Sequence, residues 1–200
     1  MKREYFSHAA KDARRHSQET TAERCIVLID ARYLAWLAHP AVAGSSQASV
    51  NRIGLADFLT DLLLQSGLEV NLKRIYWYAE VHNSLDVEGQ IVRKVFPHDV
   101  DGGVSLLQTM GQDLRKLADN KACEHVLLAT DDERFFSAID DVQLTGMSVH
   151  ILADDAARNM SSLHQTDPGW GRLLSQADRR IVVQSKVLAD FLLGANKKEV

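Results

Sequence analysis

Acidic side chains follow two buried-strand patterns that lie far apart in the sequence. Residues 25–30 (CIVLID) and 125–130 (HVLLAT) are continuous apolar runs, typical of strands covered on both faces of a parallel sheet. The first run ends in a carboxylate, Asp30, and the second is followed by three acids, Asp131, Asp132 and Glu133. Because the carboxyl ends of parallel strands meet at one edge of a sheet, we expect these four acids to lie close together.

Carboxylates gathered at one edge repel one another unless a cation or a shared proton relieves them. Mg²⁺ and Mn²⁺ are the usual occupants of a site built only from oxygen ligands. The sequence therefore predicts a Mg²⁺ or Mn²⁺ site with Asp30, Asp131 and Asp132 among its ligands. A simpler interpretation is that these acids cap the helices that follow the strands, because acids are favoured at helix N-termini.

A further acid, Asp113, lies in a segment with helical periodicity over residues 103–120. It is three to four residues from Met110 and Leu117, which places it at the edge of the apolar stripe. A carboxylate in that position needs a partner. We expect Asp113 to join the other acids if the helix crosses the sheet obliquely, and the alternative is a salt bridge with a basic residue such as Arg115 or Lys116.

Strand and helix patterns alternate along most of the chain. Strands are expected at 25–30, 72–81, 125–130 and 147–154, and helices at 32–38, 49–65, 103–120 and 132–144. The run at 91–97 fits either a strand or the start of a helix. The alternation predicts an α/β fold with a mostly parallel sheet and helices on both faces.

Two segments flank this α/β pattern. Residues 1–22 are mildly basic and read as a flexible arm, and residues 23–155 form the predicted domain. Residues 156–200 are expected to be a helical extension, with helices at 170–179 and 183–194. Its leucine, valine and phenylalanine side chains would otherwise lie in water, so we expect this extension to pack on the domain.

Three segments in this order resemble the NYN domain family, a branch of the PIN-like metal-dependent ribonucleases. They are VLIDARYL, then MGQDLRKLA, then HVLLATDDERFFSAIDDVQLTGMSVHIL. The resemblance covers roughly residues 24–154 and rests on order and spacing. It implies a three-layer fold, a Mg²⁺ or Mn²⁺ site and hydrolysis of RNA phosphodiester bonds. By position, three acids match acidic residues of the family: Asp30, Asp113 and Asp132.

The chain departs from the family pattern at several positions. Ala31 and Tyr33 stand where the family has Gly and Asn after the first Asp, and Leu107 stands near a further family Asp. In the last motif Asp131 replaces a Gly and Arg134 replaces an Asp. An arginine cannot bind a metal ion, but it can bind a phosphate or neutralise the acids.

Three functions remain open. The first is a Mg²⁺- or Mn²⁺-dependent ribonuclease in which Asp30, Asp113 and Asp132 are catalytic and basic residues bind the RNA backbone, namely Arg14, Arg15, Arg32 and Arg134. The second is a catalytically degenerate domain that binds RNA or a protein partner. The third is a phosphohydrolase acting on a small nucleotide. Whether Arg134 points into the acidic cluster separates the first two.

Composition narrows the class of protein. With 23 Lys and Arg against 27 Asp and Glu, the formal net charge is −4, which excludes a uniformly basic nucleic-acid-binding chain. The charged opening residues lack the apolar run of a signal peptide, and no segment reaches the roughly 18 apolar residues of a membrane span. We expect a cytoplasmic protein that does not bind membranes. The apolar C-terminal segment also offers a surface for homodimerisation.

Overall fold

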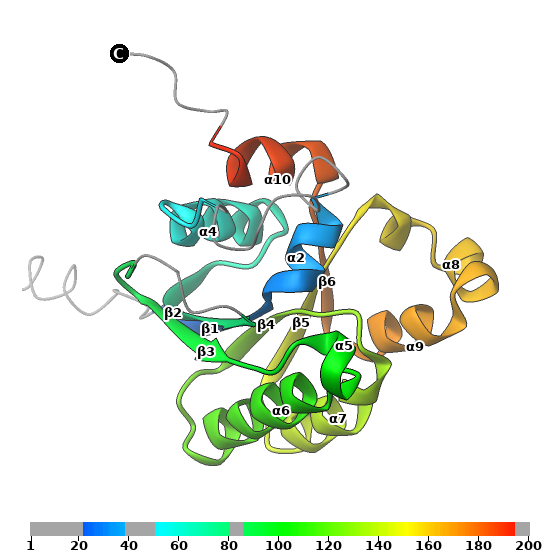
Figure 1. The fold of residues 1–200 in the computed structure, drawn as a ribbon, viewed down its shortest axis with the longest axis horizontal. Helices are drawn as coiled ribbons and strands as arrows, with labels where there is room; N and C mark the ends of the chain where they lie inside the picture. Colours follow the sequence, from blue (N-terminus) through cyan, green and yellow to red (C-terminus); the bar gives the residue numbers. More distant parts are fainter. Residues whose placement is uncertain (1–21, 39–50, 81–85, 195–200) are drawn as a thin grey trace, which may run out of the picture.

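A six-stranded parallel sheet forms the centre of the computed structural model, which describes residues 22–38, 51–80 and 86–194 (Figure 1). The strand order is β3-β2-β1-β4-β5-β6, and every neighbouring pair is parallel. The strands are β1 Glu23–Asp30, β2 Val70–Ala79, β3 Gln90–Lys94, β4 His125–Ala129, β5 Ser148–Ala153 and β6 Arg179–Val182. The expected α/β fold is therefore confirmed.

Helices lie on both sides of this sheet (Figure 1). On one side are α2 Ala31–Leu37, α4 Leu55–Gln65 and α10 Ser185–Leu192, and on the other are α5 His98–Asp101, α6 Val104–Asp119 and α7 Phe136–Gln143. Two further helices, α8 Met160–Thr166 and α9 Pro168–Gln176, follow β5. Short 3₁₀ turns, η2 Glu133–Phe135 and η3 Asp155–Arg158, follow β4 and β5.

The two central strands, β1 and β4, are buried on both faces because helices cover the sheet from each side. All five residues of β4 are buried, as are the last six of β1. From β1 the chain builds β2 and β3 outward in one direction, and β4, β5 and β6 extend in the other. The strand order therefore reverses between β1 and β4, where ligands bind in open α/β sheets, outside the carboxyl ends of the strands.

Most expected elements are present, with shifted ends. The run at 91–97 is a strand, β3, and the helix expected over 49–65 begins only at Leu55. Gly54 precedes that helix with a φ of 76°, a left-handed conformation that interrupts helical geometry before Leu55. Residues 1–21, including Arg14 and Arg15, and residues 39–50 lie outside the described residues.

The C-terminal extension is not purely helical, which corrects the sequence-based expectation. Residues 179–182 form β6, which pairs with β5 and places Ile181 opposite Leu152. Ile181 is fully buried. The extension thus completes the sheet rather than lying only on its surface. In the parts of the chain that the structure describes, every helix is too short or too polar to cross a lipid bilayer.

Candidate functional site

Asp30 lies at the strand-order reversal and uses only one of its two carboxylate oxygens. As the N-cap of α2, its Oδ1 accepts a hydrogen bond of 2.9 Å from the Arg32 backbone N–H. Its Oδ2 is buried and has no hydrogen-bond partner among the described residues. Burial raises the pKa of Asp30 to about 6, with a smaller contribution from Asp131, while Arg32 opposes the shift.

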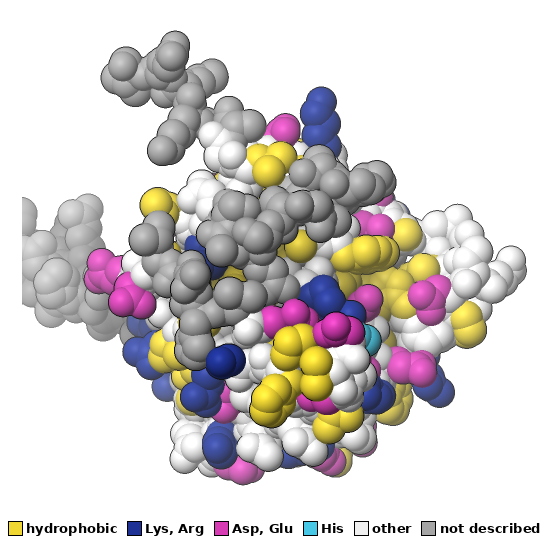
Figure 2. All heavy atoms as spheres, in the orientation of Figure 1, with side chains coloured by type: hydrophobic (Ala, Val, Ile, Leu, Met, Phe, Trp, Pro, Cys, Tyr) yellow, Lys and Arg dark blue, Asp and Glu magenta, His cyan; other side chains and the backbone are white. Residues whose placement is uncertain are grey.

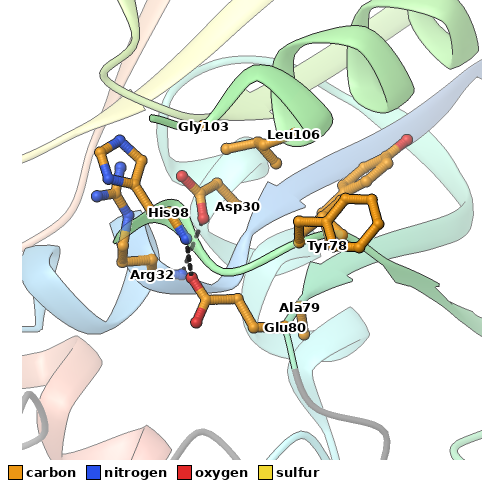
Figure 3. Close-up of a pocket in the computed structure, with 10 residues that line it drawn as sticks. Asp30, Arg32, Tyr78, Ala79, Glu80, His98, Gly103 and Leu106 are labelled. Carbon is orange, nitrogen blue, oxygen red and sulfur yellow. Dashed lines mark hydrogen bonds between the residues drawn. The ribbon is translucent and has the colours of Figure 1, made fainter. Parts of the chain in front are cut away.

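A small pocket of about 10 Å³ opens beside Asp30 (Figure 3). Its polar lining includes Arg32 from α2, Glu80 directly after β2, and His98 from α5. Glu80 Oε1 accepts a 3.0 Å hydrogen bond from the His98 backbone N–H, which ties the end of β2 to the start of α5. A volume of this size holds about one water molecule or one ion.

Asp132, at the end of β4, caps the 3₁₀ turn η2 and is neutralised by Arg134. Its Oδ1 accepts a 3.0 Å hydrogen bond from the Arg134 backbone N–H, and the guanidinium reaches Oδ2 at 2.6 Å. Partial burial opposes ionisation, but these hydrogen bonds keep the pKa of Asp132 below its usual value. Arg134 also donates to the Gly102 carbonyl at 2.9 Å, so it links η2 to the turn before α6.

Asp131 has a different electrostatic environment from its neighbour. Desolvation by the surrounding protein raises the pKa of Asp131, and the carboxylates of Asp132 and Asp167 add to the shift, while Arg32 opposes it. Burial thus disfavours the charged carboxylates of both Asp30 and Asp131, and the positive charge of Arg32 stabilises both of them. Acidic and basic side chains gather on this face, between α2 and α5 (Figure 2).

Asp113 is buried at the edge of the apolar face of α6, as the helical periodicity predicts, but its partners come from the sheet. Arg93 of β3 donates to its two carboxylate oxygens at 2.6 and 2.9 Å, and the Tyr78 hydroxyl donates at 2.9 Å. Asp113 thus forms a salt bridge, the alternative to joining the other acids, but its partner is Arg93. Arg115, one of the partners expected from the sequence, pairs with Asp141. Across the described residues, no three His, Cys, Asp or Glu side chains are arranged to hold a metal ion together.

A second, larger pocket of about 410 Å³ has Asp131 in its lining. It is lined by α2, the end of β4 and the start of α9, through Trp36, Asp131, Glu133, Asp167, Pro168, Gly169 and Trp170. Sequence reasoning missed Trp36, Glu80 and His98 as site residues. Glu80 lies inside the strand expected over 72–81 and comes to a strand end only because β2 stops at Ala79, so the rule that identified Asp30 missed it. His98 and Trp36 depend on helix placement.

Comparisons with known proteins inform the fold. The sequence matches no protein-family model and no curated protein. A structure of a protein of unknown function from Vibrio parahaemolyticus is similar, with a TM-score of 0.55 and 14% identity, over 84% of this chain and 98% of that chain. A provisionally assigned oxidoreductase from Parabacteroides merdae gives a TM-score of only 0.31 at 14% identity, over 82% of this chain and 32% of that one. The first similarity supports the α/β fold, and the second is too weak for any inference.

Proposed function

We propose that this chain is a divalent-cation-dependent phosphodiesterase acting on RNA, with its centre at the carboxyl ends of β1 and β4. One observation carries the proposal: Asp30 is 3% exposed at the strand-order reversal, and its Oδ2 lacks a partner among the described residues. A buried carboxylate oxygen left unpaired is costly to folding, so its retention indicates a role with a ligand. The resemblance to NYN domains suggests the reaction class.

The residues around Asp30 suit Mg²⁺ or Mn²⁺. Asp30 would hold the cation with Glu80 or Asp131 nearby, all through the oxygen ligands that these ions prefer. Mg²⁺ in phosphoryl-transfer sites is commonly bound by one or two carboxylates together with the substrate phosphate, so a preformed cluster of three acids is not required. Such a cation lowers the pKa of bound water and stabilises the leaving oxygen.

The chain's own residues would bind and orient the RNA backbone. Arg32 is exposed on α2 beside Asp30. Arg134, whose side chain is 42% exposed, contacts the turn at Gly102 and Gly103, and Gly103 lines the pocket at Asp30. Guanidinium groups bind phosphate oxygens through paired hydrogen bonds, which fixes the backbone without reading sequence. Near pH 6 Asp30 holds a proton in a fraction of molecules, and a bound cation would displace it.

A second candidate function is binding of RNA or a protein partner without hydrolysis, and one contact favours it. Arg134 already neutralises Asp132, one of the acids expected to hold the cation. The positive charge of Arg134 therefore takes the place next to Asp132 that a metal ion would occupy, as expected of a domain that has lost its catalytic metal site. A phosphohydrolase for small nucleotides has less support, because the sequence contains no phosphate-binding loop of the GxxxxGK(S/T) type. A cytoplasmic location belongs to the proposal in either case.

Cleavage assays on three proteins test the proposal. Wild type should cleave single-stranded RNA in Mn²⁺ and not in EDTA, whereas Asp30→Asn should lose cleavage by at least about 100-fold while remaining folded. Arg134→Ala, which frees Asp132, should tighten Mn²⁺ binding in calorimetry. Mn²⁺-independent or undetectable cleavage by wild type would overturn the hydrolase, and retained RNA binding in that case would leave the second candidate.

A further inference from the structure

The pocket lined by Trp36 is larger than the one at Asp30, and one of its lining residues, Asp131, lies near enough to Asp30 to raise the pKa of that carboxyl. Trp36 is 56% exposed, whereas the other two tryptophans of the chain, Trp77 and Trp170, are 2% and 7% exposed. An indole held half in water beside a pocket of about 410 Å³ offers a flat apolar face to a ligand. The inference below rests on the proposed function, because it concerns the substrate of the same site.

Packing holds the Trp36 ring in place. Tyr33 stacks on it with ring centroids 5.8 Å apart and contacts Trp170 edge-on at 5.9 Å. The Tyr33 hydroxyl donates a 2.8 Å hydrogen bond to the Leu152 carbonyl, which anchors this row of rings to β5. Tyr33 therefore supports the exposed Trp36 ring from the side of the sheet.

The helix α2 presents Arg32 and Trp36 from one exposed face, because residues four apart lie one turn from each other. Their Cβ atoms are therefore about 6 Å apart. A nucleotide carries its phosphate and its base on either side of one ribose, a separation of similar size. A phosphate held at Arg32 would consequently place the attached base against Trp36.

Three carboxylates, Asp131, Glu133 and Asp167, also line the pocket and form what we call its acidic wall. Asp167 Oδ1 caps α9 by accepting from the Trp170 backbone N–H, and Arg172 donates to Glu133 Oε2 at 3.2 Å. A Cβ at position 169 would lie 2.5 Å from that Glu133 oxygen, so the glycine makes room for it. Each carboxylate retains acceptor capacity, and acceptors select bases that present N–H donors.

We propose that the Trp36 pocket binds the base next to the scissile phosphate and prefers guanine. Guanine presents a ring N–H and an amino group side by side, a donor pair that matches the two oxygens of a carboxylate. Uracil presents one ring N–H between two carbonyl groups, which carboxylates would repel. Stacking on Trp36 supplies affinity to any base, and the acidic wall supplies the choice among them.

Tryptophan fluorescence tests this binding without cleavage, because the titrations are run in EDTA. Guanosine monophosphate should quench the emission of wild type and bind about ten-fold more tightly than uridine monophosphate, with adenosine and cytidine monophosphates between them. Trp36→Phe should reduce the quench to the part that comes from Trp170, which also lines the pocket, but keep the affinity, measured by calorimetry, within about three-fold. Trp36→Ala should weaken the affinity about ten-fold or more.

Two results would overturn the base pocket. One is equal affinity for all four nucleotides. The other is tighter binding of N-acetylarginine amide than of guanosine monophosphate in the quenching titration, which would assign the pocket to a cationic peptide. Leu64→Ala, which removes an exposed apolar side chain from α4, is the control and should leave the affinity unchanged. Nucleotide binding in EDTA with no Mn²⁺-dependent cleavage would refute the hydrolase while sustaining the base pocket. Mn²⁺-dependent cleavage without any preference for guanine nucleotides in binding would refute the base pocket while sustaining the hydrolase.

Discussion

At the scale of single residues, Asp30 performs a structural task with one carboxylate oxygen and leaves the other for the ligand that we propose. Helix capping needs one oxygen, and Oδ1 supplies it to the Arg32 N–H. The second oxygen contributes nothing to the fold that the described residues reveal, and its burial works against the charged form. The capping interpretation and the ligand interpretation of this acid are therefore compatible, because they use different atoms.

Replacement of Asp30 by asparagine should stabilise the protein in EDTA at about pH 8. The carboxyl binds its proton more tightly when folded, with a pKa of about 6, than when unfolded, so its stabilising contribution is full below about pH 4 and is lost as pH rises through 6. Asparagine keeps the cap and removes this dependence. Urea unfolding should show a gain of about 2–3 kcal/mol at pH 8 and little change at pH 4.

Asp154→Asn provides the matched control, since Asp154 also caps a turn by accepting from the Ala156 N–H. It should shift the free energy of unfolding by less than about 0.5 kcal/mol at pH 8. A gain at pH 8 equal to the one in Asp30→Asn would indicate a general effect of surface charge rather than relief of a buried carboxylate.

Asp113 is predicted to act in stability rather than in catalysis. Asp113→Asn breaks the ion pair with Arg93 and weakens the hydrogen bond from Tyr78, so the free energy of unfolding should fall by about 1–3 kcal/mol. Mn²⁺ affinity, measured by calorimetry, should stay within about two-fold of wild type. Tyr78→Phe should cost a smaller part of the same stability, and a loss of Mn²⁺ affinity in Asp113→Asn would return this acid to the metal site.

The sequence could predict which acids occur at strand ends, but not which of them are paired. Helical periodicity placed Asp113 at the edge of the buried stripe correctly, and it is 7% exposed. Its partner Arg93 lies in an adjacent strand whose register depends on the pairing of β3 with β2. Pairing between segments far apart in the sequence is set by the assembled sheet, so the ion pair of Asp113 with Arg93 could not be predicted. The contact of Arg134 with Asp132 is local, and the sequence offered it as one of two alternatives for Arg134.

At the scale of elements, the turn between α5 and α6 positions the groups around Asp30. Gly102 and Gly103 both have positive φ, 61° and 77°, and the turn brings the His98 ring and the Arg134 guanidinium close to Gly103. A Cβ at position 103 would lie 2.8 Å from the His98 ring and 3.0 Å from the guanidinium. The absence of a side chain there is therefore required by both conformation and packing.

Gly103→Ala should destabilise the protein more than Gly89→Ala. Both glycines have similar φ, 77° and 75°, so alanine costs each about 1–2 kcal/mol in backbone strain. Nothing lies within 4 Å of a Cβ at Gly89, whereas at Gly103 two side chains must move. Chemical unfolding should show at least about 1 kcal/mol of extra loss at Gly103, and RNA binding should weaken in that variant alone; equal losses would contradict the packing argument.

Element prediction succeeded where both faces of a strand are buried and failed at the sheet edge. The runs ending at Asp30 and before Asp131 are apolar throughout because helices cover both sides of β1 and β4. Residues 179–182, RRIV, include only one buried side chain, Ile181, since an edge strand contacts one neighbour and keeps much of its surface in water. The sequence of such a strand has no hydrophobic periodicity, so the sequence of the extension predicts only helices.

At the scale of the whole molecule, the fold concentrates charge of both signs at one edge while the net charge is −4. A parallel sheet directs the ends of all its strands to that edge, and the strand-order reversal opens it between β1 and β4. In the proposed function, the acids there hold the cation and the arginines among them contact the RNA backbone. RNA binding should therefore depend on a few arginines rather than on a broad basic surface.

The salt dependence of RNA binding should measure this number of contacts. Each phosphate contact on a single strand changes the slope of log Kobs against log salt by about 0.7, so Arg32→Ala should flatten the slope by about that amount in EDTA. Deletion of residues 1–22 should flatten it further if Arg14 and Arg15 bind the backbone, as the sequence predicts. Lys73→Ala is the control, because this exposed lysine lies near the start of β2, toward the opposite edge of the sheet from Asp30. The contrary result is a slope that stays unchanged in Arg32→Ala and flattens in Lys73→Ala. It would place the RNA away from the carboxyl ends of β1 and β4.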